Sequence, residues 1–147
     1  MAYINQDQKK EKAAAIKKMI GEKYADFKIK YTMGIEHYTK LRFTIAASNI
    51  DFAEIYKKIF DKRFEGREEE IPMYYPTGFV FDVEQVNEYY LEDNFEGRIL
   101  EMFLDIRKIM NSGNHDNSDI MTDYFDVGWY IAITIGRWNK PYILLTA

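Results

Sequence analysis

The amino-acid sequence predicts an α+β fold, with a largely antiparallel sheet and three amphipathic helices on one face of that sheet. Several stretches alternate apolar and polar residues, which is typical of strands with one buried face. Other stretches carry apolar residues at helical spacing. The 147 residues are enough for one core, so we expect a single domain over residues 1–147. The expected order of elements is α-β-β-α-β-α-β.

The first part of the chain predicts a helix and a basic hairpin. A helix over residues 5–20 is expected because Ile16, Met19 and Ile20 recur at helical spacing. Two strands follow, over residues 26–33 and 40–48, and each alternates apolar with basic or polar side chains. Their connection is too short for a parallel crossover, so they pair as an antiparallel hairpin.

The middle of the chain predicts two further helices and a strand. Asp51 precedes an apolar stripe that runs to residue 63, and Glu54 follows three residues later, which is the form of a capping box. Residues 64–78 hold two prolines, two glycines and three consecutive glutamates, so we expect a surface loop. Residues 79–91 fit a strand, with a helix as the alternative. Asn94 is then expected to cap a helix that ends near Met110.

The stretch 119–138 predicts the central strand of the sheet. From Phe125 to Ile135 the odd positions are bulky and apolar, and the even positions are small or polar. The odd face is therefore expected to face the core, and the even face solvent or a partner. A short edge strand is expected over residues 142–145.

Composition restricts the kinds of protein that the chain can be. It has no cysteine, which excludes disulfides and thiolate chemistry and suits the cytoplasm. No apolar run is long enough to cross a membrane, and no secretory signal begins the chain. The net charge of −4 divides into +6 over residues 1–63 and −10 over residues 64–147. Such asymmetry indicates either a basic face for nucleic acid or two halves that balance each other in the fold.

Catalysis is not predicted by any motif of the sequence. It contains no Ser–His–Asp order, HExxH, Walker loop or GxGxxG, so we expect binding rather than catalysis, and no cofactor. Asp116, Asp119 and Asp123, with His115 beside them, are weak candidates for an oxygen-ligated metal site. Aspartates in such a segment also serve as turn and cap residues, which is the simpler interpretation. His37 falls in the hairpin loop and is expected to be exposed.

The far face of the sheet is the candidate binding surface. If helices cover one face only, basic and tyrosine side chains share the other: Lys28, Lys30, Lys40, Arg42, Tyr124 and Tyr130. Such a face suits a protein partner, because tyrosine and arginine are enriched at interfaces. It also suits a single nucleic-acid strand, held by phosphate contacts and base stacking. For a protein partner, the acidic half offers another surface, which would mimic DNA through Glu68–Glu70, Glu92, Asp93 and Glu96. The third hypothesis is a metal-dependent enzyme that uses Asp116, Asp119, Asp123 and His115.

The C-terminal half resembles the class-29 large polyvalent-protein-associated domain. The residues that carry the resemblance are Asn87, Tyr89, Asn94-Phe95-Glu96-Gly97, Asp116–Asp119, Asp123-Tyr124-Phe125, Gly136-Arg137-Trp138 and Pro141-Tyr142. This resemblance implies an accessory protein of a phage or a conjugative element, one that travels with DNA or blunts host defence. We therefore expect it to bind a host or element protein, with a counter-defence role. It implies no catalytic residues.

Overall fold

The computed structural model describes residues 3–81, 83–114 and 128–145, and it confirms the α+β class. Two 3₁₀ turns, Ala25–Phe27 and Glu68–Glu70, join the helices and strands. In chain order the helices and strands are α1 (Gln6–Lys23), β1 (Lys30–Glu36), β2 (Lys40–Ser48), α2 (Phe52–Arg63), α3 (Ile71–Tyr74), β3 (Glu84–Val86), α4 (Leu91–Asn94), α5 (Gly97–Met110), β4 (Tyr130–Ile135) and β5 (Ile143–Leu144).

The sheet is mixed, although the sequence predicts mainly antiparallel pairing. The strand order is β1-β2-β4-β3, and β5 pairs with the end of β2. The hairpin β1–β2 and the pair β3–β4 are antiparallel, as expected, but β2 pairs in parallel with both β4 and β5. A parallel pair needs a long connection, and the segment between β2 and β4 is long enough to hold α2, β3 and α5.

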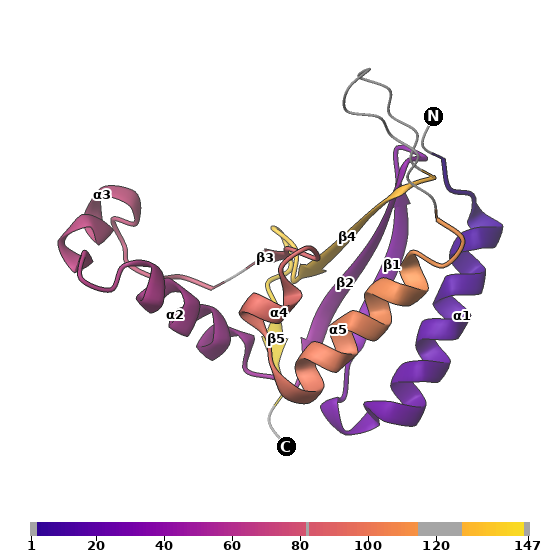
Figure 1. Cartoon of the computed structure of the whole chain (residues 1–147), viewed down its shortest axis with the longest axis horizontal. Helices are drawn as coiled ribbons and strands as arrows, with labels where there is room; N and C mark the ends of the chain where they lie inside the picture. The colour runs from indigo at the N-terminus through magenta and orange to yellow at the C-terminus, as the bar shows by residue number, and fades with distance from the viewer. Residues whose placement is uncertain (1–2, 82, 115–127, 146–147) are drawn as a thin grey trace.

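Helices α1 and α5 cover one face of the sheet (Figure 1). The buried core joins Ile16 of α1 and Phe103 of α5 to alternate residues of β2 and β4, among them Phe43 and Ile133. In β4 the odd residues face this core, as predicted from the alternation. Burial of this apolar surface is the main stabilising contribution to the fold.

Ion pairs at the exposed end of the helix layer link the two halves of the sequence. The Nζ atom of Lys23 lies 2.8 Å from Oδ2 of Asp105 on α5. Arg98 of α5 donates two hydrogen bonds to Asp26, of 2.6 and 2.8 Å, and its guanidinium lies over the ring of Phe27. The Lys23–Asp105 pair therefore balances a small part of the charge asymmetry of the sequence, whereas the Arg98–Asp26 pair joins the minority charges of the two halves.

Local sequence signals position the first helices. The Asn5 side chain accepts from the Gln8 amide while the Gln8 side chain accepts from the Asn5 amide, which is a complete capping box. Asp51 accepts from the amide of Glu54 at the start of α2. Asn94 does not cap α5; it ends the short α4, and Glu96 occupies the N-cap position without a side-chain bond.

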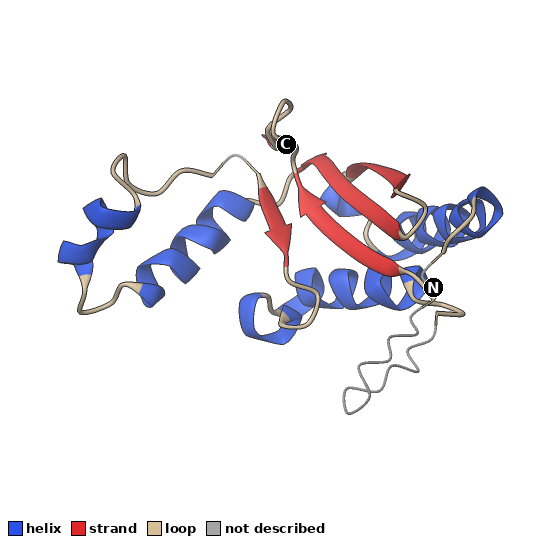
Figure 2. Cartoon of the chain, turned by 90° about the horizontal axis from the view of Figure 1, so that it is seen from above, coloured by secondary structure: helices blue, strands red, loops and turns tan. Residues whose placement is uncertain are grey.

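Helix α2 starts at the core but extends away from the sheet, although three helices were expected on one face. Its first residue, Phe52, is fully buried among core rings, whereas Phe60, two turns later, packs on Tyr75 and Phe79. The apolar stripe of α2 is thus partly covered by the chain that returns from α3. Figures 1 and 2 show α2 and α3 extending to one side of the sheet. In the described part of the chain, no helix combines the length and apolar character that a membrane span requires.

Candidate functional site

Among the described residues, no helix covers the face of the sheet opposite α5 (Figure 2), and we call it the open face. The register places corresponding side chains of neighbouring strands side by side: Lys40 beside Tyr130, Arg42 beside Ala132, and Thr44 beside Thr134. The open face consists of Thr32, Gly34, Glu36, Lys40, Arg42, Thr44, Gln85, Tyr130, Ala132 and Thr134.

Three of the six predicted binding residues come together on the open face. Lys40, Arg42 and Tyr130 lie on two neighbouring strands. Lys30 is exposed at the start of β1, next to a shift in the strand register. The strand expected from residue 26 is wrong at its start: the chain forms a 3₁₀ turn there, and Lys28 follows it, outside β1, with a φ of 54°. A binding role for Lys28 stays a prediction.

Arg42 is held in place by an ion pair on the open face. Its Nε atom bonds Oε1 of Glu36, and its Nη2 atom lies 3.1 Å from Oε2 of the same carboxylate. The hydrogen bond from Arg42 lowers the pKa of the Glu36 carboxyl, so this group stays ionised. Lys40 forms no salt bridge among the described residues, but its charge also helps to lower the pKa of Glu36, so Glu36 compensates Lys40 only in part.

Sequence reasoning missed Arg137 and Trp138, which extend the basic surface. Two backbone hydrogen bonds between Arg137 and Lys140, of 2.8 and 3.1 Å, close a tight turn between β4 and β5. This segment rises from the open side of the sheet in Figure 2. The Nη2 atom of Arg137 lies 3.4 Å from Oγ1 of Thr32 on the far strand β1, so the side chain spans the open face. Trp138, at the tip of the turn, is 89% exposed.

The hydroxyl groups at the centre of the open face are already hydrogen-bonded to each other. Thr44 and Thr134 are 3% and 7% exposed, and their hydroxyl oxygens lie 3.0 Å apart in a mutual hydrogen bond. The sequence predicts that these even positions face solvent or a partner, yet the two threonines are buried between neighbouring side chains. The groups that can bind a partner therefore lie around this centre.

The metal candidates Asp116, Asp119 and Asp123, with His115, lie outside the described residues, as does Tyr124. Within residues 3–81, 83–114 and 128–145, no group of three or more histidine, aspartate or glutamate side chains could hold a metal ion.

The acidic residues considered for DNA mimicry do not gather on one surface. Glu68–Glu70 precede α3, whereas Glu92, Asp93 and Glu96 belong to α4 and the start of α5. Figure 1 shows α3 and α4 well apart, on the extended side and beside the sheet. These six acidic residues therefore form no continuous acidic surface.

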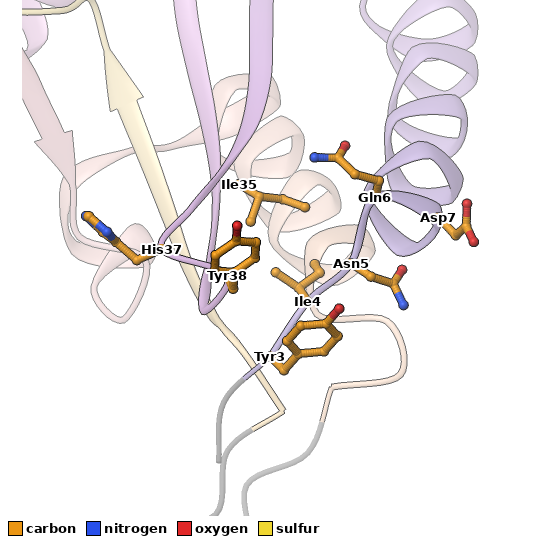
Figure 3. A pocket seen from close by; sticks show the side chains of 8 residues that line it. All are labelled: Tyr3, Ile4, Asn5, Gln6, Asp7, Ile35, His37 and Tyr38. Atoms are coloured by element: carbon orange, nitrogen blue, oxygen red, sulfur yellow. The ribbon is translucent and has the colours of Figure 1, made fainter.

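A pocket of about 680 Å³ lies between the start of α1 and the β1–β2 turn. Figure 3 shows its lining, with Tyr3 and Tyr38 on the same side and His37 turned away from it. Asn5, in its wall, is already bonded within the capping box. The pocket is therefore lined by two tyrosine rings and the first residues of α1, and its described side chains form no convergent catalytic group.

A second pocket, of about 330 Å³, lies between α2 and β3. Glu84 and Tyr56 line it, and burial raises the pKa of both the carboxyl and the phenol. Arg63 lies close enough to Glu84 to lower the carboxyl pKa in part. These groups form a polar cleft lined by one carboxyl, one phenol and one guanidinium.

Comparison with protein-family models, curated proteins and solved structures finds no match for the chain. The resemblance of the C-terminal half to the class-29 domain stays a prediction.

Proposed function

We propose that the protein is a non-catalytic binding module, which holds a negatively charged protein partner on its open face. The observation that carries the proposal is that both ends of the open face bear a cation with an exposed ring: Lys40 beside Tyr130 at one end, and Arg137 next to Trp138 at the other. Trp138 is 89% exposed and Tyr130 is 48% exposed. Tryptophan, tyrosine and arginine are the residues that most often dominate binding energy at protein interfaces.

The charges of this surface support a partner of opposite sign. Glu36 neutralises Arg42 in part, but Lys40 and Arg137 pair with no carboxylate among the described residues. Unpaired cations beside exposed rings attract acidic side chains and accelerate their association. The resemblance of the C-terminal half extends the proposal to a phage or mobile-element accessory protein that acts in the cytoplasm on a host or element protein, in counter-defence.

Nucleic acid is the second candidate, and the same rings favour it. Trp138 and Tyr130 could stack bases while Lys40 and Arg137 contact phosphates, and stacking contributes roughly 1–3 kcal/mol per base. This binding would weaken steeply with salt, because each phosphate contact releases a condensed counterion.

Site-specific photo-crosslinking separates the two candidates. A photoreactive benzoylphenylalanine replaces Tyr130 in the whole chain, and the cells that express it are irradiated. A control carries the same residue in place of Lys17, which is exposed on α1. Adducts that form at position 130 but not at 17, and that protease removes while nuclease does not, support the protein partner. Nuclease-sensitive adducts would transfer the function to nucleic acid.

Charge reversal checks that the open face itself makes the contact. Lys40→Glu combined with Arg137→Glu should remove the adducts at position 130. Lys10→Glu combined with Lys17→Glu changes the net charge equally on α1 and should leave them unchanged. Adducts that survive the first pair, or an absence of adducts at position 130 in every case, would refute the proposal.

A further inference from the structure

The cleft of about 330 Å³ between α2 and β3 has the size of a small-molecule site. Such sites have volumes of roughly 300–1,000 Å³ and combine apolar walls with a few convergent polar groups. One face of α2 lines this cleft, with Tyr56, Ile59, Phe60 and Arg63 at helical spacing, and β3 contributes Glu84. The chain that returns from α3 completes the wall.

Aromatic rings hold the walls of the cleft in place. The ring of Phe60 lies 5.1 Å from that of Tyr75 and 5.3 Å from that of Phe79, and all three residues line the cleft. Tyr56 stacks on Phe81 at 5.6 Å. Tyr75 is 37% exposed, so its ring is accessible to a ligand. The cleft is therefore preformed, and it presents aromatic surface to a flat molecule.

Three half-buried polar side chains of the cleft have no hydrogen-bond partner in the described part of the chain. The Tyr56 hydroxyl, the Glu84 carboxyl and the Asn94 amide make neither a hydrogen bond nor a salt bridge with a described residue. Burial raises the pKa of the Glu84 carboxyl, and the charge of Arg63 opposes this shift in part. Because polar groups inside a protein are normally hydrogen-bonded, these three are suited to bond a ligand.

The polar groups of the cleft are arranged along α2. Tyr56 and Arg63 are seven residues apart on this helix, so their Cα atoms lie about 10 Å apart along its axis. Glu84 interacts electrostatically with both side chains. Tyr56 and Glu84 are half-buried, whereas Arg63 is exposed. A ligand that matches this arrangement carries N–H donors at its inner end, a flat body, and an anionic group at the mouth of the cleft.

We propose that this cleft binds a guanine nucleotide. A carboxylate accepts two hydrogen bonds at once, and guanine presents two adjacent donors, N1–H and N2–H, which match Glu84. The base lies against the ring of Tyr75. The phosphate lies toward Arg63, whose guanidinium forms paired hydrogen bonds with phosphate oxygens. The proposal is independent of the proposed function, because Lys40 and Arg137 do not line this cleft.

The test is isothermal titration calorimetry of the whole chain with guanosine monophosphate (GMP), adenosine monophosphate (AMP), guanosine and inorganic phosphate. We expect GMP to bind at least about tenfold more tightly than AMP, because adenine places an acceptor beside its donor group and cannot give Glu84 two hydrogen bonds. Guanosine should bind more weakly than GMP, and inorganic phosphate should give no heat at the same concentration. This selectivity is measured on the parent chain, so it tests the proposal even if a variant fails to fold.

Two variants test the assigned contacts. Glu84→Gln should weaken GMP binding by at least about tenfold, because the carboxamide accepts only one of the two hydrogen bonds. Arg63→Gln should reduce the affinity for GMP to that for guanosine. Glu65→Gln and Lys17→Gln are the matched controls, since both residues are exposed outside the cleft, and they should leave the affinity for GMP unchanged.

The open-face variant Lys40→Glu combined with Arg137→Glu should also bind GMP as the parent does, which separates this proposal from the proposed function. An absence of GMP binding at millimolar concentration would overturn the proposal. Equal affinities for GMP and AMP, or GMP binding that Glu84→Gln leaves intact, would overturn it as well.

Discussion

The β1–β2 turn offers a direct test of how local backbone geometry contributes to stability. His37 and Tyr38 have φ angles of 53° and 61°, and the amide of Thr39 bonds the carbonyl of Glu36 at 3.2 Å. Three residues, 37–39, separate the paired Glu36 and Lys40, and two of them have positive φ, the region in which Asn and Gly are the preferred residues. Neither histidine nor tyrosine favours this conformation. His37→Asn combined with Tyr38→Gly should therefore stabilise the fold.

The magnitude follows from two opposing terms. A residue with a side chain costs roughly 1–2 kcal/mol in the left-handed region. Glycine removes that cost at Tyr38, but its flexibility in the unfolded chain returns roughly 0.5–1 kcal/mol. Asparagine tolerates the conformation better than histidine and adds a smaller gain. The net expectation is about 1 kcal/mol of added unfolding free energy, or an increase in Tm of about 3 °C for a chain of this size.

Little else should change, because the contacts of the turn are made by the backbone. The carbonyl of Tyr38 accepts from the amide of Ile4 at 2.8 Å, and the carbonyl of Thr39 accepts from the amide of Tyr130 at 2.8 Å. The Tyr38 side chain is 73% exposed, so its removal loses little buried surface.

Urea denaturation followed by tryptophan fluorescence measures the effect. Lys17→Gly, at an exposed position inside α1, is the control: there glycine should cost about 1 kcal/mol, with the opposite sign. A hairpin variant no more stable than the parent would show that the side chains of His37 and Tyr38 outweigh the turn geometry, and the reasoning would fail.

Two further predictions concern tyrosine. The Tyr142 hydroxyl bonds the side chain and carbonyl of Ser48 and lies 2.7 Å from the carbonyl of Ile50, so Tyr142→Phe should lower the unfolding free energy by roughly 1–3 kcal/mol in urea titrations. An unchanged midpoint would contradict this. The second prediction is a loss of stability above about pH 10, the ordinary pKa of tyrosine. Burial raises the folded-state pKa of Tyr24, Tyr31, Tyr56 and Tyr142, so the unfolded chain loses its phenolic protons first as the pH rises. Lys12 acts in the opposite direction, since burial lowers its pKa. In thermal unfolding, the Tm of Tyr56→Phe should fall less steeply with pH above about 10 than the Tm of the parent. An equal slope would contradict a large contribution of Tyr56 to the loss of stability.

The positions of the helices and the hairpin in the chain could be predicted from short-range sequence patterns. The Asp51 cap lies within three residues of the amide that it bonds, so the sequence alone locates the start of α2. For α1 both Asn5 and Asp7 are suitable cap residues in the sequence, and the structure selects Asn5. The alternation in β2 and β4 gives the face that meets the core, because side chains on a strand alternate in direction. The same alternation places Lys40, Arg42 and Tyr130 on the other face, but the β2–β4 pairing is what makes Lys40 and Tyr130 neighbours.

Tertiary structure alone decided how distant segments meet. The parallel pairing of β2 with β4 joins residues about 90 positions apart, as the Thr44–Thr134 pair illustrates, and no local pattern encodes that register. Helix α2 has the apolar stripe of a core helix. However, part of this stripe packs on the chain that returns from α3 rather than on the sheet. Arg137 joins the open face only because the turn after β4 directs its side chain across to Thr32. The sequence by itself therefore determined the elements and their inward faces, which depend on neighbours in the chain. The composition of the binding surface depended on strand order and packing, which only the assembled fold establishes.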